Sequence, residues 1–123
     1  MILESFVRCF VNSDALDSTV EFYKTLLDGK ESLRFDYPET GLRLASVSAP
    51  HLSVLVIAGD ADKRKPFEAT QITIKVTRLE DYGGLLASQG AELIDPIQKT
   101  PVGRKMRYRH ADGLIVEYVQ HDA

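Results

Sequence analysis

One carboxylate stands in the most apolar part of this 123-residue sequence, the run from Leu114 to Val119. The run is rich in β-branched and aromatic residues, which favours a strand. Burying a lone carboxylate in such a strand costs free energy unless another group pairs with it. Glu117 therefore faces either solvent or a site, and it is the first candidate for a functional side chain.

The other residues with chemistry to offer are isolated from one another. His110 precedes the predicted tight turn Asp112-Gly113 and could act as an acid or a base at the rim of a cleft, although a plain surface histidine is the simpler interpretation. His51 and His121 show no ligand spacing, His121 lying in the tail, and Cys9 is interpreted as a small buried hydrophobic residue. No phosphate-binding loop, Ser-His-Asp order or Cys-x-x-Cys pattern is present. We assign no catalytic residue.

Hydrophobic periodicity and turn residues predict the elements that must position these side chains. Leu16, Val20, Tyr23 and Leu27 have the spacing of an amphipathic helix, after good N-cap residues at 12–14. The second helix is weakened by Gly83-Gly84. The predicted helices are 14–27 and 79–88. The predicted strands are 5–11, 31–37, 41–47, 51–57, 70–77, 91–98, 104–110 and 114–119.

The order β-α-β-β-β thus occurs twice, and the repeat can be followed residue by residue. Val54 and Val116 are 62 positions apart, and the same offset places Leu55 opposite Glu117. Aligning the two first strands places Phe6 opposite Gln71, and a slip of one residue would place Val7 there instead. The first module is predicted at 1–57, a polar linker at 58–69 and the second module at 70–123, together one structural domain.

Two such modules in one chain resemble the vicinal oxygen chelate superfamily, which includes glyoxalase I, extradiol dioxygenases and bleomycin-resistance proteins. The specific matches are Asp14 ahead of a helix with Phe22-Tyr23, Gly90-Ala91-Glu92, the turn Pro101-x-Gly103 and the ending 112–117. The resemblance covers nearly the whole chain. It implies an α+β fold in which the two βαβββ modules form a cup-shaped mixed sheet with the helices on its outer face.

Enzymes of that superfamily usually place His, Gln or Glu on the first and last strands of each module, around one divalent metal. Carried over by position, this sequence offers Phe6 (or Val7), Leu55, Gln71 and Glu117. Two of the four are apolar, whereas a catalytic metal site needs about three protein ligands or more. Gln71 and Glu117 remain as weak metal ligands, and the competing interpretation is a hydrogen bond between them across the cup. We expect no cofactor, with weak divalent metal binding as the alternative.

Strand alternation predicts what the cup presents to a ligand. Its lining is mostly apolar with a few polar groups, as is usual in small-molecule pockets. Arg8 and Lys75 have the parity of the cup face and could contact an anionic group, and the competing interpretation is that solvent surrounds them at the edge or rim of the sheet. The predicted ligand-binding residues are Phe6, Arg8, Phe10, Leu55, Gln71, Thr73 and Glu117.

Composition limits the function classes. A net charge of −3 argues against a nucleic-acid partner, and no apolar run has the length of a membrane span or of a secretory signal. The single Cys9 fits a reducing compartment, and we expect a cytoplasmic protein. The favoured function is a non-catalytic small-molecule binder of the bleomycin-resistance type, a homodimer by family resemblance. The alternatives are a divalent-metal-dependent glyoxalase-like lyase or dioxygenase, and a cup filled by its own side chains.

Overall fold

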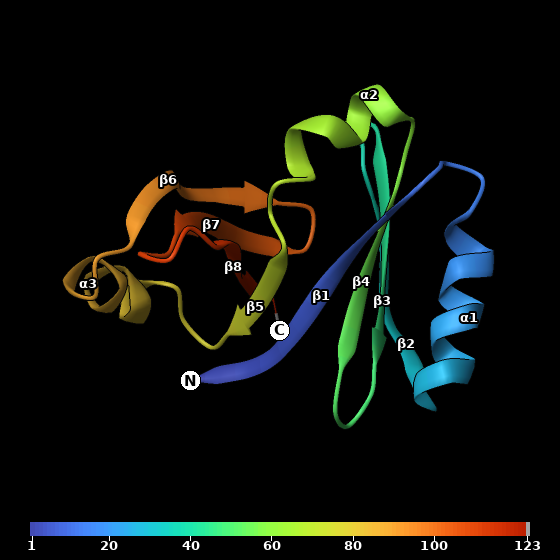
Figure 1. The fold of residues 1–123 in the computed structure, drawn as a ribbon, viewed down its shortest axis with the longest axis horizontal. Helices are drawn as coiled ribbons and strands as arrows, with labels where there is room; N and C mark the ends of the chain where they lie inside the picture. Colours follow the sequence, from blue (N-terminus) through green and yellow to red (C-terminus); the bar gives the residue numbers. More distant parts are fainter. Residues whose placement is uncertain (123) are drawn as a thin grey trace. The chain divides into compact units, whose positions relative to one another are not determined.

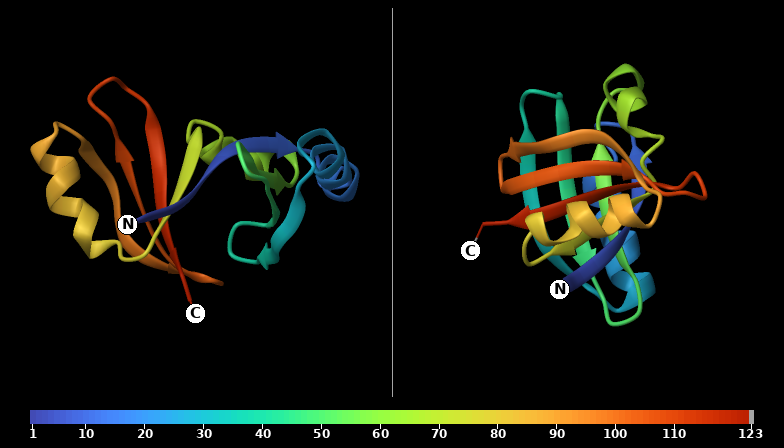
Figure 2. Two further views of the ribbon diagram at one scale, coloured as in Figure 1. Left: turned by 90° about the horizontal axis from the view of Figure 1, so that it is seen from below. Right: turned by 90° about the vertical axis from the view of Figure 1, so that its left-hand side faces the viewer.

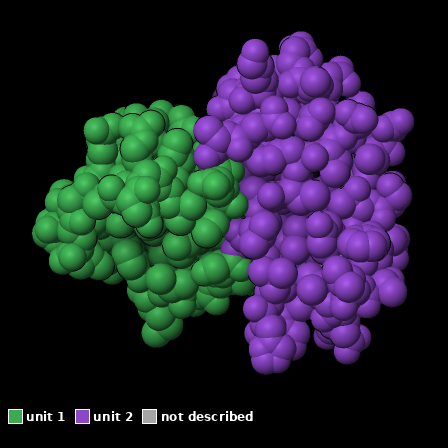
Figure 3. Space-filling view, viewed as in Figure 1, with its two compact units in different colours: residues 1–5, 70–123 green, residues 6–69 purple. Residues whose placement is uncertain are grey.

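The structure, a computed structural model, describes residues 1–122. The chain divides into two compact units (Figures 1 and 3). Unit 2 spans residues 6–69, and unit 1 comprises residues 1–5 together with the chain from residue 70 onward. The first strand, β1 (Ile2–Val11), supplies residues to both units.

Unit 2 contains the first βαβββ module. Its strands follow the order β2-β3-β4-β1, with β1 parallel to β4 and the other neighbours antiparallel. Residues in the predicted linker form a short helix and a 3-10 turn within this unit. After β1, the elements of unit 2 are α1 (Leu16–Leu27), β2 (Lys30–Tyr37), β3 (Leu42–Ser48), β4 (Ser53–Ala58), α2 (Ala61–Arg64) and η1 (Lys65–Phe67).

Unit 1 repeats the arrangement. Its strands follow the order β6-β7-β8-β5, with β5 parallel to β8 and the other neighbours antiparallel. The start of the chain joins this unit, because the Met1 ammonium donates to Thr77 Oγ1 at 3.0 Å and the Thr77 amide donates to the Met1 carbonyl at 2.9 Å. The elements are β5 (Ile72–Val76), α3 (Glu80–Ser88), β6 (Glu92–Thr100), β7 (Gly103–Arg109) and β8 (Ile115–His121).

The predicted α+β fold of two βαβββ modules with mixed strand pairing is confirmed. The register of the repeat agrees as well. In unit 2 the parallel ladder pairs Arg8 with Leu55, and in unit 1 it pairs Thr73 with Glu117. Leu55 and Glu117 therefore occupy equivalent positions of the two modules, as the 62-residue offset predicts.

In unit 2, α1 covers one face of the sheet (Figure 1). Leu16 and Val20 are almost completely buried against Val47, Val54 and other residues of β3 and β4. Burying each such side chain contributes roughly 1.5–3 kcal/mol. Since side chains alternate along a strand, this packing directs the other set of strand residues to the opposite face.

In unit 1, α3 lies across one face of the strands (Figure 2). Its side chains Tyr82 and Leu86, with Leu79 just before the helix, pack on Met106 and Tyr118. The helix forms despite Gly83 and Gly84 because this packing offsets their low helix propensity. The face of the sheet that carries Glu117 is the one that α3 leaves uncovered.

One local prediction, the N-cap at residues 12–14, is wrong. Helix α1 begins after Ala15 with no side-chain cap, because Ser13 Oγ donates to Asp60 Oδ1 at 3.2 Å and Asn12 Oδ1 accepts from Arg64 at 3.2 Å. Strand β6 continues past Pro96, with a register shift between residues 95 and 98 that accommodates a residue unable to donate to the ladder. No helix within residues 1–122 is long and apolar enough to cross a membrane.

Candidate ligand-binding site

The predicted site residues of unit 2 share the sheet face opposite α1. Phe6 and Leu55 are buried in one cluster, and Phe10 packs against it. The guanidinium carbon of Arg8 lies 5.6 Å from the centre of the Phe10 ring, within the range of a cation–π interaction. The structure therefore brings Phe6, Arg8, Phe10 and Leu55 together on one face, as predicted.

Aromatic side chains of this unit cover part of that face. Phe35 and Tyr37 of β2 and Phe67 of η1 pack against the cluster that contains Phe6 and Leu55. Because Phe6 and Leu55 are less than a tenth exposed, the face is largely filled by its own side chains.

Three serine hydroxyls extend the same face and were missed by the sequence reasoning. Ser46 pairs in register with Leu55, and its Oγ lies 2.8 Å from Ser32 Oγ, which accepts from Ser48 Oγ at 2.7 Å. The sequence pattern does indicate their position, because Ser46 and Ser48 continue the alternation of Leu42 and Leu44 along β3. The hydroxyls satisfy one another, which makes burial of Ser46 inexpensive.

In unit 1 the candidate carboxylate is held by two partners. Thr73 Oγ1 donates to Glu117 Oε1 at 3.3 Å, and Lys105 Nζ lies 3.8 Å from Glu117 Oε2. The side chains of Lys105 and Glu117 are each only 15% exposed. Glu117 thus faces neither open solvent nor an apolar environment, because its charge is compensated by an ammonium group.

Gln71 is placed differently from its prediction. It is an exposed residue just before β5, and its backbone amide donates to the Ile115 carbonyl at 3.1 Å. The partner of Glu117 on the neighbouring strand is Thr73. The hydrogen bond that was expected from Gln71 is therefore made by Thr73, which lies two residues later in the chain. Both residues have the same parity, which is why the sequence did not distinguish them.

Two further cationic side chains, Arg107 and Lys75, lie on this face of unit 1. Arg107 is paired in register with Glu117, and its side chain donates to Asp95 Oδ2 at 2.8 Å and to Thr70 Oγ1 at 3.1 Å. Lys75 has the same parity as Thr73, is half-buried, and forms no ion pair within residues 1–122. Lys75, Lys105 and Arg107 thus share this region with the carboxylates of Glu117 and Asp95, and only Lys75 among the three cations has no ion pair within residues 1–122.

His121 also belongs to this region, although the sequence placed it in the tail. It is the last residue of β8. Burial, and secondarily the positive charge of Lys75, lower the pKa of His121, while the carboxylates of Glu117, Asp122 and Glu4 act in the opposite direction. The net lowering keeps this imidazole neutral at neutral pH.

The donor atoms for a metal are few. Among the described residues, which end at 122, no group of three or more His, Cys, Asp or Glu side chains could hold a metal ion. At the positions that the resemblance gives to metal ligands, Phe6 and Leu55 carry no donor atom, and Glu117 already faces Lys105. This set of side chains does not fit the metal centre of the superfamily's enzymes.

Solved structures of other proteins share this fold. An uncharacterised protein from Methanosarcina mazei is 39% identical, with 99% of this chain and 94% of that chain covered and a TM-score of 0.85. Methylmalonyl-CoA epimerase from Mycobacterium tuberculosis is 19% identical over 100% of this chain and 94% of its own, with a TM-score of 0.68. A variant of the Streptomyces coelicolor epimerase in complex with 2-nitronate-propionyl-CoA is 16% identical over 98% and 99% of the two chains, with a TM-score of 0.64.

The chain has the vicinal oxygen chelate fold that these epimerases share, and the uncharacterised Methanosarcina mazei protein is its relative by sequence. No family model matches the sequence, and no curated protein matches it. At under 25% identity, the likeness to the epimerases concerns the fold alone.

Proposed function

We propose that this protein binds a small anionic molecule without catalysing a reaction and without a resident metal. The observation that carries the proposal is Lys75, a half-buried ammonium group on the sheet face of unit 1 that α3 leaves uncovered, which forms no ion pair within residues 1–122. Lys105 is neutralised by Glu117, and Arg107 by Asp95, which leaves Lys75 as the cation without a carboxylate partner.

The environment of Lys75 suits an anionic group. Its side chain is half-buried, so an ion pair there is less screened than one in open solvent. Thr73 precedes it on the same face, and the imidazole of His121 lies close enough for the Lys75 charge to lower its pKa. An ammonium group beside a hydroxyl and a neutral imidazole can bind a carboxylate through charge-assisted hydrogen bonds.

Lys105 supports a site without a metal. In the enzymes that the chain resembles, a divalent ion compensates the carboxylate at the position of Glu117. Here an ammonium group lies 3.8 Å from that carboxylate, and Phe6 and Leu55 supply no ligand. Replacing Lys105 by a metal would require displacing an ammonium group that is only 15% exposed.

The test is a calorimetric titration with a carboxylate and a thioester that share one acyl group, propionate and propionyl-CoA. The second is chosen because one structural neighbour was solved with a propionyl-CoA derivative. Propionamide is the neutral control. We expect a charged compound to bind, and Lys75→Gln to weaken binding about tenfold, the equivalent of one charge-assisted hydrogen bond.

Lys63→Gln in α2 removes an equal charge from unit 2 and serves as the matched control variant. Equal binding of propionamide, or an unchanged affinity in Lys75→Gln, would contradict the proposal. Alanine variants of Phe6, Phe10 and Leu55, measured in the same titration, test whether the aromatic face of unit 2 contributes to affinity.

We further propose that the protein is a cytoplasmic homodimer, as the family resemblance implies. Exposed apolar side chains near the start of β1 suit this assembly, since Ile2 and Leu3 are each 52% exposed. Sedimentation equilibrium measures the oligomeric state of the wild type and of the double variant Ile2→Lys/Leu3→Lys. A dimer that becomes a monomer in the variant supports this interface, and a wild-type monomer contradicts the dimer.

A further inference from the structure

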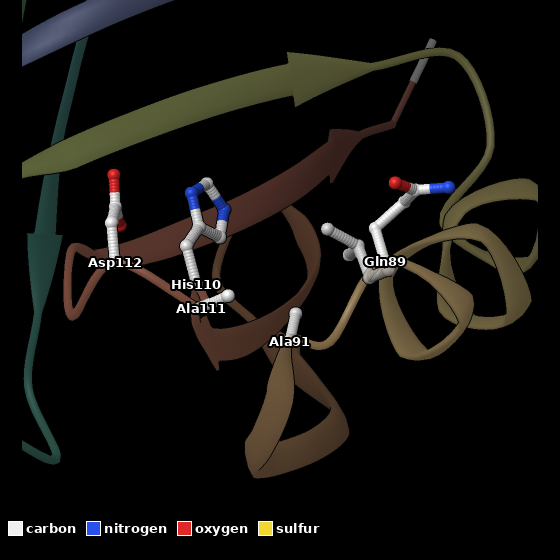
Figure 4. A pocket seen from close by; sticks show the side chains of 6 residues that line it. Gln89, Ala91, His110, Ala111 and Asp112 are labelled. Carbon is white, nitrogen blue, oxygen red and sulfur yellow. The ribbon is translucent and has the colours of Figure 1, made fainter.

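A pocket of about 340 Å³ lies in unit 1, on the side of the sheet that α3 covers (Figure 4). It is formed between the end of α3 and the turn that joins β7 to β8. Its lining residues are Leu86, Gln89, Ala91, His110, Ala111 and Asp112. The pocket is separate from the face that carries Glu117, because Tyr118, the partner of His110, points to the opposite side of β8 from Glu117.

Hydrogen bonds fix the polar wall of the pocket. The amide of His110 donates to the Leu114 carbonyl and that of Gly113 to the His110 carbonyl, each at 2.8 Å. Asp112 Oδ1 accepts from the Leu114 amide at 3.0 Å, which holds the carboxylate in place beside the turn. His110 Nε2 lies 2.7 Å from the hydroxyl of Tyr118, a buried side chain, so the imidazole is held as well.

The lining of the pocket carries a single permanent charge, which is negative. Asp112 is the only lining residue with a permanent charge, and no lysine or arginine is among the six. The C-terminal end of α3 lies at the pocket, where Gln89 follows the last helical residue, and a helix C-terminus carries a partial negative charge. Figure 4 shows the Gln89 amide, the His110 ring and the Asp112 carboxylate projecting toward the same side.

The remainder of the lining is apolar. Leu86 and Ala91 are half-buried, and Ala111 adds a methyl group from the turn. The amide of Ala91 donates to the Leu86 carbonyl at 3.0 Å, which fixes these two walls relative to each other. An apolar wall with a few convergent polar groups is the usual construction of a small-molecule site.

We propose that this pocket binds a small organic cation, a primary ammonium group on a short apolar chain. The ammonium group pairs with the Asp112 carboxylate, and the negative end of α3 adds to the attraction. The apolar chain lies against Leu86, Ala91 and Ala111. This site is independent of the proposed anion site, since no residue is shared between them.

The probe is n-butylammonium, titrated into the ¹⁵N-labelled protein while amide chemical shifts are recorded. We expect saturable shifts at the amides of Ala91, Ala111 and Gly113. The uncharged n-butanol should bind at least threefold more weakly, and butyrate should cause no saturable shift at these amides. A threefold effect corresponds to one partly exposed ion pair with the helix end nearby.

Asp112→Asn is the decisive variant, because asparagine keeps the Oδ1 acceptor for the Leu114 amide and removes only the charge. Asp112→Asn should weaken the affinity for n-butylammonium about threefold or more and leave the affinity for n-butanol unchanged. The control variant Asp62→Asn in α2 should change neither affinity. Ala111→Phe, which fills the pocket, should abolish binding of both compounds. Shifts that map elsewhere, equal binding of butyrate, or an unchanged affinity in Asp112→Asn would overturn the proposal.

Discussion

The ion pair between Lys105 and Glu117 supports a quantitative prediction about stability. At 3.8 Å and an effective dielectric constant of about 20, the Coulomb attraction is about 4 kcal/mol. Desolvation of both ions offsets most of that attraction, because each side chain is 15% exposed. We expect a net coupling free energy of about 1–2 kcal/mol, larger than the roughly 0.2–1 kcal/mol of exposed pairs.

A double-mutant cycle measures this coupling. The variants are Lys105→Met, Glu117→Gln and the double substitution, with the free energy of unfolding obtained from urea titrations. Each single substitution leaves a half-buried partner without its counter-ion, so each should destabilise the protein by about 1–3 kcal/mol. The double variant should be destabilised by less than the sum of the single variants.

The matched control is the ion pair between Arg109 and Glu92, which also lies in unit 1. Its atoms are 3.0 Å apart, but its side chains are 47% and 70% exposed, and we expect a coupling of about 0.5 kcal/mol or less. If the Lys105–Glu117 coupling were no larger than this control, the argument that Lys105 compensates the Glu117 carboxylate would be refuted.

Three further predictions concern the stability of the fold. Arg104, through its hydrogen bonds, lowers the pKa of Glu80 to about 2, so the stability contributed by Glu80 is complete above its unfolded pKa near 4.5 and disappears as the pH falls through about 2. The stability difference between wild type and Glu80→Gln should therefore persist at pH 4 in acid unfolding curves, and its loss by pH 4 would contradict the assignment. Leu16→Ala should lower the free energy of unfolding in urea by about 2–5 kcal/mol, and a loss below about 1 kcal/mol would mean that α1 is loosely packed. Asp28→Gly should raise Tm, because Asp28 ends α1 at a φ of 52°, which favours glycine. The free energy of unfolding should rise by up to about 1 kcal/mol, and a lower Tm would contradict this reasoning.

The sequence was sufficient for the elements and the repeat because both depend on local patterns. The offset between Leu55 and Glu117, for example, agreed with the observed pairing. Such patterns depend on the two-residue period of a strand, which sequence displays directly.

The partners of Glu117 were not accessible in the same way. Gln71 and Thr73 have the same parity, and only the register of the parallel ladder between β5 and β8 selects Thr73. A parallel pair is joined by a long connection, so no tight turn specifies its register in the sequence. Lys105 looks like any lysine on a strand until the pairing of β7 with β8 brings it beside Glu117.

The pocket beside α3 was also beyond the sequence. His110 was recognised as a side chain at a possible cleft rim, but its neighbours Gln89 and Ala91 follow a helix that is distant along the chain. Their association depends on how α3 packs on Tyr118 and Met106, which is a tertiary effect.

The most direct test of the central claim is a calorimetric titration of the purified, chelator-treated protein with Mn²⁺, Ni²⁺ and Zn²⁺, alongside Glu117→Gln. A site in which Lys105 takes the place of the metal predicts no stoichiometric binding at micromolar affinity in either protein. Stoichiometric binding at micromolar affinity or tighter that is lost in Glu117→Gln would contradict the claim, and would favour a metal-dependent lyase or dioxygenase instead.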